Sequence, residues 1–317
     1  MTPPDPERFE ALVRRVDARG CEVVPAAGGD PVFCSVRGRL HRFGKAERSP
    51  LAAGDRVLVL EGKGGASVDR VLPRRSRFAR ESTSGGRPQV VAANLDLVAA
   101  LLPAAEPAPN LRLTDRVVVA AAAQGVEGLV VVSKTDLAPA REVAALESIY
   151  ARAGVAVVKV CAPRGEGLEA LAARFRGRTS VLVGPSGAGK STLLQALLGP
   201  GSPELATGRV NAKTGKGRHT TTAVRLLHFP GGGWVVDTPG VRTLAVPDLR
   251  PADLPMFFPD LAPFTGECRF QDCTHRVEPG CAAAAAAARG DIDPRRLDSY
   301  RAMLATMIEE AERRRGW

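Results

Sequence analysis

The segment GPSGAGKST, at residues 184–192, constrains the fold of this chain more than any other feature. It follows an apolar stretch typical of a buried strand, and it leads into LLQALL, which is typical of a helix. Glycines between a strand and a helix allow backbone amides to turn inward around a phosphate group. An ordinary glycine-rich turn before a helix is the alternative. The complete pattern in this context favours a phosphate-binding loop.

Within this loop, Lys190 is expected to reach the β- and γ-phosphates, and the Ser191 hydroxyl is expected to ligate Mg²⁺. The predicted nucleotide-binding residues of the loop are Gly184, Pro185, Ser186, Gly187, Ala188, Gly189, Lys190, Ser191 and Thr192. ATP and GTP carry the same phosphates, so the loop leaves the choice of base open.

The segment SKTD, at residues 133–136, follows the apolar strand LVVV and has the form of the N-K-x-D guanine motif. Asp136 offers two acceptors to guanine N1–H and the exocyclic amine, which adenine cannot satisfy. The stem of Lys134 is expected to lie over the base, with Thr135 beside it. Ser133 replaces the asparagine of the motif and makes fewer hydrogen bonds, so we expect weaker affinity. Such a segment is often only a helix N-cap, and the other motifs decide for guanine.

Two further loops complete the predicted site. DTPG, at residues 237–240, follows the strand WVV. Asp237 is therefore expected to hold Mg²⁺ through water, and Gly240 to offer its amide to the γ-phosphate. The segment CAP after the strand VAVVKV is the companion loop, where the Ala162 amide is expected to contact guanine O6.

The order of these loops along the chain is the key observation. The guanine segment comes before the phosphate loop, whereas ordinary GTPases begin with the phosphate loop. A site at the carboxyl ends of parallel strands tolerates this change, because the loops still converge there. The order therefore indicates a circularly permuted P-loop GTPase domain with a doubly wound α/β sheet. We expect its strands at 95–102, 128–132, 155–160, 179–183 and 233–237, and its helices at 113–124, 139–153, 167–176 and 190–198.

Residues 21–72 contain short strands broken by glycine, among them 31–40, 55–60 and 66–72. About five such strands predict a small β-barrel, for which an oligonucleotide-binding (OB) barrel is one candidate. A small barrel binds RNA, protein or nothing, so the barrel alone does not indicate a function. The polar segment 74–89 is expected to be a linker.

Four metal-ligand side chains gather near the end of the chain: Cys268, Cys273, His275 and Cys281. Three thiolates and one imidazole form a closed tetrahedral zinc set, which suits a structural site. Reduced thiols in an alanine-rich core are the alternative, but the polar residues between the ligands are poor core filler. The alanine run 282–288 is expected to begin a helix, and 294–315 to form another.

The net charge is +10, with the excess in residues 1–245 and a slightly acidic tail. A basic front half suits a polyanion such as RNA, although solvated arginines explain the charge equally well. No apolar run approaches the roughly 18 residues of a spanning helix, and the acidic, proline-rich start is unlike a signal peptide. We therefore expect a cytoplasmic protein without a membrane partner.

Together, the permuted order, GRHTTT at 217–222, VAANLD at 91–96 and the Cys/His cluster resemble the ribosome small subunit-dependent GTPase A family (RsgA, also called YjeQ). The resemblance covers most of the chain. It implies an OB-type N-terminal domain, zinc at the cluster, and GTP hydrolysis stimulated by the small ribosomal subunit. It also implies a role in late assembly of that subunit.

The residue after DTPG is Val241, whose aliphatic side chain cannot orient the attacking water. His219 in GRHTTT is the candidate replacement, and the family resemblance gives it a catalytic role. The alternative is a histidine that only contacts phosphate or RNA. One of Thr220, Thr221 or Thr222 is expected to complete the Mg²⁺ shell, and we assign this role to Thr221.

We therefore expect an OB-like barrel with an N-terminal extension at 1–80, a permuted GTPase domain at 81–245 and a zinc-binding helical domain at 246–317. The expected partners are GTP and GDP, the small ribosomal subunit and its rRNA, and the chain is expected to be monomeric. Two other functions remain open at this stage. One is a permuted GTPase that acts on the large subunit or another RNA, and the other is a regulatory switch with a protein partner.

The guanine motif predicts that GTP binds more tightly than ATP, because only guanine satisfies both acceptors of Asp136. A site built for such hydrogen bonds discriminates by about 10⁴, a ratio that Ser133 reduces. The Asp136→Asn variant should shift selectivity toward xanthine nucleotides. Competition binding measures both effects, and equal affinity for ATP and GTP in the parent would contradict the guanine assignment.

Overall fold

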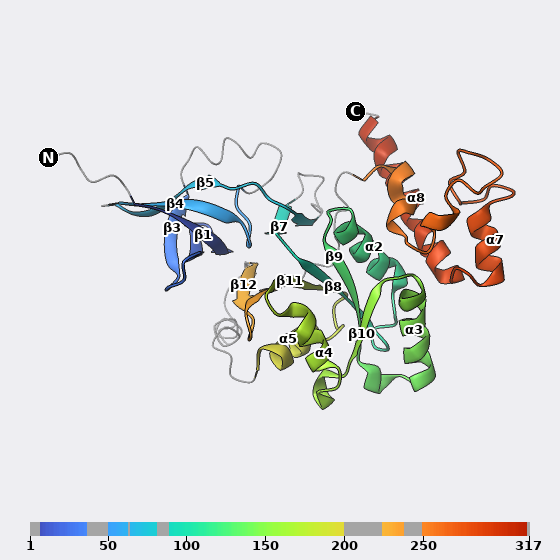
Figure 1. Ribbon diagram of the computed structural model, residues 1–317, viewed down its shortest axis with the longest axis horizontal. Helices are drawn as coiled ribbons and strands as arrows, with labels where there is room; N and C mark the ends of the chain where they lie inside the picture. Colours follow the sequence, from blue (N-terminus) through green and yellow to red (C-terminus); the bar gives the residue numbers. More distant parts are fainter. Residues whose placement is uncertain are drawn as a thin grey trace, which may run out of the picture. The chain divides into compact units, whose positions relative to one another are not determined.

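The computed structural model describes residues 7–36, 50–62, 64–80, 89–199, 224–237 and 249–315. The chain forms two compact units. The first comprises residues 1–97, 172–182 and 197–245, and the second comprises 98–171, 183–196 and 246–317. These units cut across the three domain ranges expected from the sequence, which therefore remain a prediction. Figure 1 shows the elements of both units and labels most of them.

The first unit contains a closed five-stranded barrel, which confirms the predicted barrel. Its strands are β1 (Glu7–Val16), β2 (Cys21–Pro25), β3 (Val32–Val36), β4 (Arg56–Gly62) and β5 (Gly65–Val71). Strand β1 pairs with both β2 and β4, while β5 pairs with β3 and β4, so the barrel closes in the order β1-β2-β3-β5-β4. Closure leaves no strand with an unpaired edge inside the barrel.

Alternating side chains of these strands fill the barrel core. On β1, Ala11 and Val13 are buried, while Glu10 and Arg14 on the other face are not. Val23, Val57 and Val68 belong to the same buried cluster. This period of two places every second residue inside the barrel. The sequence had indicated only an extension before residue 21, so the ten-residue strand β1 is a correction.

The first unit also holds three strands of the GTPase sheet: β11 (Arg178–Val183), β12 (Arg225–His228) and β13 (Gly233–Asp237). Strand β11 runs parallel to β13, and β13 runs antiparallel to β12. Strand β12 then pairs with barrel strand β1, so barrel and GTPase strands share one hydrogen-bonded sheet.

A two-stranded ribbon of β6 (Arg77–Arg80) and β7 (Gln89–Ala93) lies in the same unit. Strand β6 falls within the segment 74–89 that was expected to be a linker, so this expectation was wrong for residues 77–80. Phe78 and Ala79 are buried, which explains why this short stretch pairs instead of remaining solvated.

The second unit contains the rest of the α/β region. Its elements are β8 (Leu97–Pro103), α2 (Leu111–Ala122), β9 (Glu127–Ser133), α3 (Ala140–Arg152) and β10 (Ala156–Val160), with most of α5 (Lys190–Leu198). Helix α4 (Leu168–Phe175) begins in this unit and ends in the first. Strand β9 lies between β8 and β10 and runs parallel to β10. All seven residues of β8 are buried, as expected for a central strand of a sheet covered on both faces. The predicted strands and helices of the α/β region lie within two residues of these bounds.

The C-terminal part of the second unit begins with two 3₁₀ helices, η4 (Pro251–Phe257) and η5 (Ala262–Phe264). They precede α7 (Ala282–Arg289) and α8 (Pro294–Arg315), so both predicted tail helices are present. Leu254, Phe258, Leu297 and Tyr300 form one buried cluster with Val119 of α2. Figure 1 shows α8 beside α2, so this tail shares a core with the GTPase region.

One buried arginine joins these elements. The Arg296 guanidinium of α8, only 2% exposed, donates to both carboxylate oxygens of Asp260, at 3.0 and 2.8 Å. It also donates to Asp115 of α2, which is fully buried. Its charge lies over the rings of Phe258 and Tyr150, 4.7 and 5.4 Å from their centroids. Removing one partner of such an ion pair leaves an uncompensated charge in a medium that solvates it poorly.

No helix among the described residues combines the length and apolar character needed to cross a bilayer.

Asp115 is one of two carboxylates paired with the buried Arg296, so its truncation is expected to destabilise the protein strongly. The Asp115→Ala variant should lower the free energy of unfolding by about 3 kcal/mol, because Arg296 stays buried with one carboxylate fewer. Chemical denaturation measures the change. The control is Asp253→Ala, which breaks the exposed Arg250–Asp253 pair and should change stability little. Equal effects of the two substitutions would contradict the role assigned to Arg296.

Candidate active site and metal centre

The predicted phosphate-binding loop lies between β11 and α5, as its sequence requires. Lys190 is the first residue of α5, and its ammonium donates to the carbonyls of Gly184 and Pro185, at 2.7 and 2.8 Å. Ser191 and Thr192 follow in the first turn of α5 and are exposed. The backbone amides of a helix N-terminus favour an anion at this position, as the predicted phosphate-binding loop requires.

Three glycines of the loop occupy positions that other residues would not fit. A Cβ on Gly184 would lie 2.8 Å from Leu101 Cβ on the buried strand β8. Gly187 and Gly189 have φ values of +80° and +90°, in the left-handed region that favours glycine. The glycine spacing therefore reflects one close approach and two unusual backbone conformations.

The guanine segment follows strand β9 and contacts the phosphate loop directly. The Ser133 hydroxyl, buried at the end of β9, donates to the Ala188 carbonyl at 3.0 Å. Serine thus supplies one of the two kinds of contact that the motif's asparagine provides, the one to the phosphate loop. The hydrogen bonds that Ser133 fails to make are therefore the ones to the guanine base, and we expect the weaker affinity to come from their loss.

Lys134 is held by a segment that the sequence did not single out. Its backbone is left-handed, with φ of 57°, and its ammonium donates to the Glu106 carbonyl. The residue after Glu106, Pro107, lies 3.6 Å from the position of a Cβ on Gly187. The turn after β8 therefore touches both the guanine segment and the phosphate loop. No side-chain motif marks it, because its contacts use a backbone carbonyl and a proline ring.

The companion loop lies next to the guanine segment. Strands β9 and β10 are in register, with Ser133 opposite Val160, and the Thr135 hydroxyl donates to the Val160 carbonyl at 3.4 Å. Asp136 lies beside Cys161: burial raises the pKa of the Cys161 thiol, and the hydrogen bond to Asp136 raises it further. Ala162 begins the 3₁₀ helix η2 (Ala162–Arg164) immediately afterwards.

Asp237 ends strand β13 in the first unit. It lies opposite Arg225 of β12, and Arg225 Nε is 3.5 Å from Asp237 Oδ2. Burial raises the pKa of Asp237, and the Arg225 charge opposes that rise. Arg225 could not be predicted from the sequence, because only the pairing of β12 with β13 brings it to the carboxylate.

Three predicted site residues, His219, Thr221 and Gly240, lie outside the described residues. Strand β12 begins at Arg225, shortly after the GRHTTT segment in the sequence. The roles assigned to these three residues therefore remain predictions.

The four predicted metal ligands converge in the second unit. The ligand atoms of Cys268, Cys273, His275 and Cys281 all lie within 4.8 Å of one another. The three sulfurs are 3.4, 3.7 and 3.4 Å from His275 Nδ1. Tetrahedral zinc bonds of about 2.3 Å to sulfur and 2.0–2.1 Å to nitrogen place these atoms about 3.5 Å apart. The cluster therefore fits a zinc ion, with Nδ1 as the histidine ligand.

Backbone amides and α8 support this cluster. Cys281 caps the alanine helix α7, and its sulfur accepts from the Ala284 amide at 3.4 Å. Cys268 Sγ accepts from the Ala282 amide at 3.2 Å. From α8, Tyr300 donates to the Thr274 carbonyl and Arg301 to the His275 carbonyl, both at 2.9 Å. Such outer contacts orient ligands and favour the thiolate form.

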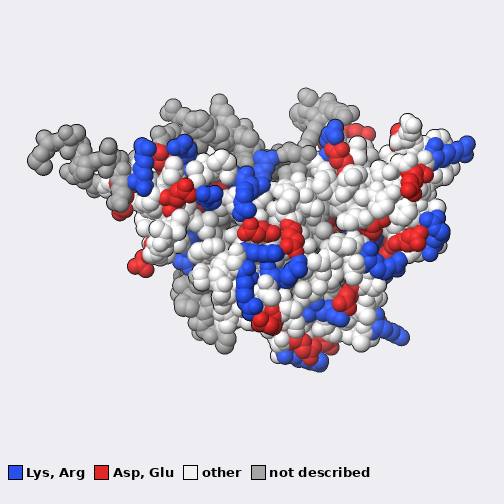
Figure 2. Space-filling view, viewed as in Figure 1, with Lys and Arg blue, Asp and Glu red and all other residues white. Residues whose placement is uncertain are grey.

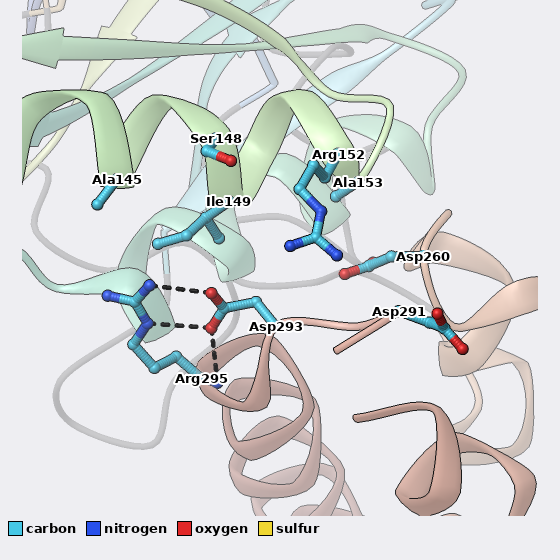
Figure 3. Close-up of a pocket in the computed structure, with 9 residues that line it drawn as sticks. All are labelled: Ala145, Ser148, Ile149, Arg152, Ala153, Asp260, Asp291, Asp293 and Arg295. Carbon is cyan, nitrogen blue, oxygen red and sulfur yellow. Dashed lines mark hydrogen bonds and ion pairs between the residues drawn. The ribbon is translucent and has the colours of Figure 1, made fainter. Parts of the chain in front are cut away.

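A separate pocket of about 150 Å³ lies between α3 and the start of α8 (Figure 3). Its charged residues are largely engaged with one another and with the backbone. Asp293 pairs with Arg295, and Arg152 donates to the Gly290 carbonyl. None of its lining residues belongs to the predicted sites, so we assign it no part in nucleotide or metal binding.

The phosphate loop, the guanine segment in contact with it and the permuted order of the two define a circularly permuted P-loop GTPase. The model of the RsgA GTPase family matches residues 71–247. The small ribosomal subunit biogenesis GTPase RsgA of Azotobacter vinelandii is 40% identical over 269 residues, which are 84% of this chain and 77% of that protein. The protein of the same name from Moorella thermoacetica is 37% identical, over 87% of this chain and 90% of its own. The chain belongs to the RsgA GTPase family and is a GTP hydrolase.

Solved structures agree with this assignment. YjeQ from Thermotoga maritima matches with a TM-score of 0.74 and 28% identity, over 95% of this chain and 99% of its own. YloQ, described as a circularly permuted GTPase, matches with a TM-score of 0.71 over 96% of each chain. Its identity is 23%, so that likeness supports the fold alone. The predicted architecture of barrel, permuted GTPase region and C-terminal Cys/His cluster is confirmed.

The cluster geometry predicts one zinc per chain in protein purified without added metal. Structural zinc contributes directly to folding, so the Cys273→Ala variant should lose the metal and unfold its tail at a lower temperature. Elemental analysis and thermal unfolding measure the two effects. The matched control is Cys34→Ala, a buried thiol of the barrel, which should keep the zinc. A metal-free Cys273→Ala variant with the thermal stability of the parent would refute a structural role.

Proposed function

We propose that this protein is a GTPase that binds the small ribosomal subunit and acts in its late assembly, with turnover stimulated by the subunit. The observation that carries the proposal is the contact of Ser133 with the phosphate loop in a permuted order. This arrangement occurs in a chain whose relatives are named small ribosomal subunit biogenesis GTPases. A rival function on the large subunit or with a protein partner has no observation in its favour.

In this proposal the nucleotide is held from two sides. Asp136 accepts from guanine, the Lys134 stem covers the base, and the Ala162 amide meets guanine O6. The phosphate loop from Gly184 to Thr192 wraps the phosphates, and Gly240 donates to the γ-phosphate. The Ser133–Ala188 hydrogen bond supports this assignment, because it ties the base-binding and phosphate-binding segments together.

Magnesium, which GTPases generally use, neutralises charge that develops on the phosphates. In this proposal Ser191 and Thr221 ligate it, and Asp237 holds it through water. The strand that leads to the phosphate loop, β11, runs parallel to β13, with Val181 opposite Val236. Asp237 follows Val236 and ends β13, the position that the DTPG motif requires of this carboxylate. We also propose that the cluster of Cys268, Cys273, His275 and Cys281 holds one structural zinc.

The partner of this chain in the proposal is the small subunit with its rRNA. The net charge of +10 favours association with a polyanion. On the face drawn in Figure 2, however, Lys and Arg side chains are interspersed with Asp and Glu. Charge on the described residues of this face therefore does not mark an rRNA surface. We further propose a monomeric, cytoplasmic protein with the three domain ranges 1–80, 81–245 and 246–317.

For hydrolysis, we propose that His219 orients the attacking water. Val241 follows DTPG and has no polar group for this task. The segment before His219 is basic, with Lys213, Lys216 and Arg218. Its positive charge favours docking on rRNA phosphate. Docking would position His219, and catalysis of phosphoryl transfer depends mainly on positioning and charge stabilisation.

This proposal predicts slow GTP turnover by the isolated protein and a large increase with purified small subunits. High salt should reduce the increase, because it weakens phosphate contacts. The His219→Ala variant should bind GTP almost normally yet lose most of the stimulated rate. Phosphate release and nucleotide binding measure these effects.

The matched control for this experiment is His228→Ala, which removes an exposed histidine of β12 and should leave stimulation intact. Full stimulation of the His219→Ala variant would show that His219 has no catalytic role. If small subunits left even the parent rate unchanged, or large subunits raised it equally, the proposed partner would be wrong.

A further inference from the structure

Strand β12 carries a charged residue whose role neither the motifs nor the comparisons assign. Arg225 lies directly opposite Asp237 in the antiparallel pair of β12 and β13. Its Nε is 3.5 Å from Asp237 Oδ2, and the two side chains are only 21% and 26% exposed. An ion pair screened from water to this extent is stronger than a surface pair and restricts both side chains more.

The ion pair places the guanidinium Nε of Arg225 next to Oδ2 of the carboxylate. A carboxylate that holds magnesium through water needs only one oxygen for that water, while the other is open to an orienting donor. Outer contacts of this kind fix the direction of a metal-binding carboxylate.

The backbone of Arg225 is itself fixed from the barrel side. Strand β1 pairs with β12 at Arg15, which is opposite Arg225. Arg14 Nε also donates to the carbonyl of Leu226, the next residue of β12, at 3.4 Å. Strand β12 is thus bonded on both edges, to β13 and to β1. Pairing on both edges fixes the position of Arg225 along the strand direction relative to Asp237.

We propose that Arg225 is a positioning residue that orients the Asp237 carboxylate for the magnesium of the nucleotide complex. The proposal rests on the function proposed above, in which Asp237 holds magnesium through water. Arg225 does not touch the nucleotide in this role.

The test measures binding rather than hydrolysis. Dissociation constants of a fluorescent, non-hydrolysable GTP analogue are determined over a range of Mg²⁺ concentrations and in EDTA. The Arg225→Met variant should need about tenfold more Mg²⁺ for half-maximal tightening, the loss expected for one hydrogen bond to a charged group. Its affinity in EDTA should equal that of the parent, and Arg225→Lys should restore part of the effect.

A matched control separates positioning from general loosening of β12. Arg14→Met removes the side-chain bonds to Leu226 and Glu22 but keeps the backbone pairing of β12 with β1 and β13, so it should leave the Mg²⁺ requirement unchanged. An equal shift in Arg14→Met and Arg225→Met would overturn the proposal, because both would then act through the strand. An unchanged or lower Mg²⁺ requirement in Arg225→Met would also overturn it, and a lower one would show that the arginine competes with the metal.

Asp237→Ala distinguishes failure of this inference from failure of the proposed function. If Asp237→Ala tightens with Mg²⁺ as the parent does, the magnesium assignment of Asp237 is wrong. If Asp237→Ala loses the Mg²⁺ effect while Arg225→Met keeps it, the assignment stands and only the role of Arg225 fails.

Discussion

The hydrogen bond from Ser133 to Ala188 is the interaction on which the nucleotide site depends, because it joins two loops that the permutation has exchanged in order. In the chain the guanine segment precedes the phosphate loop by about fifty residues, yet the buried hydroxyl and carbonyl are 3.0 Å apart. The contact needs only that both loops leave the same edge of a parallel sheet. Permutation changes which strands the loops connect in sequence, but the loops that carry the site still lie at this edge of the sheet. It also sends the chain beyond DTPG directly into the C-terminal region.

That C-terminal region is joined to the GTPase elements by charge as well as by apolar packing. Arg296 reaches Asp115 on α2 and Asp260 after η4, and it lies over the ring of Tyr150 on α3. From the same helix, Tyr300 and Arg301 bond the backbone of the predicted zinc loop. One helix therefore contacts both the Cys/His cluster and two GTPase helices. A buried ion pair adds little net stability compared with apolar packing, but it penalises any other arrangement of these helices.

The sequence was most informative where function requires a local pattern. The phosphate loop, the guanine segment and the Cys/His cluster were predicted because their residues lie close together in the chain, between elements with clear periodicity. Strand β1 was missed because Phe9, Leu12, Val13 and Val16 also fit the three- and four-residue spacing of a helix. Only closure of the barrel, with Ala11 and Val13 inside, decides for a strand. The roles of Glu106, Arg225 and Arg296 were not predictable, since each depends on contacts between distant segments.

Strand β12 makes such a contact between distant segments, because it joins barrel strand β1 to strand β13. It is the only described strand that pairs with both the barrel and β13, through Arg225 in each case. The pairing of β12 with β1 opposes a shift of β12 against β13, and such a shift would move Arg225 away from Asp237, because a shift of one residue turns each side chain to the other face of a sheet. A single four-residue strand, β12, therefore connects the barrel to the carboxylate that ends β13.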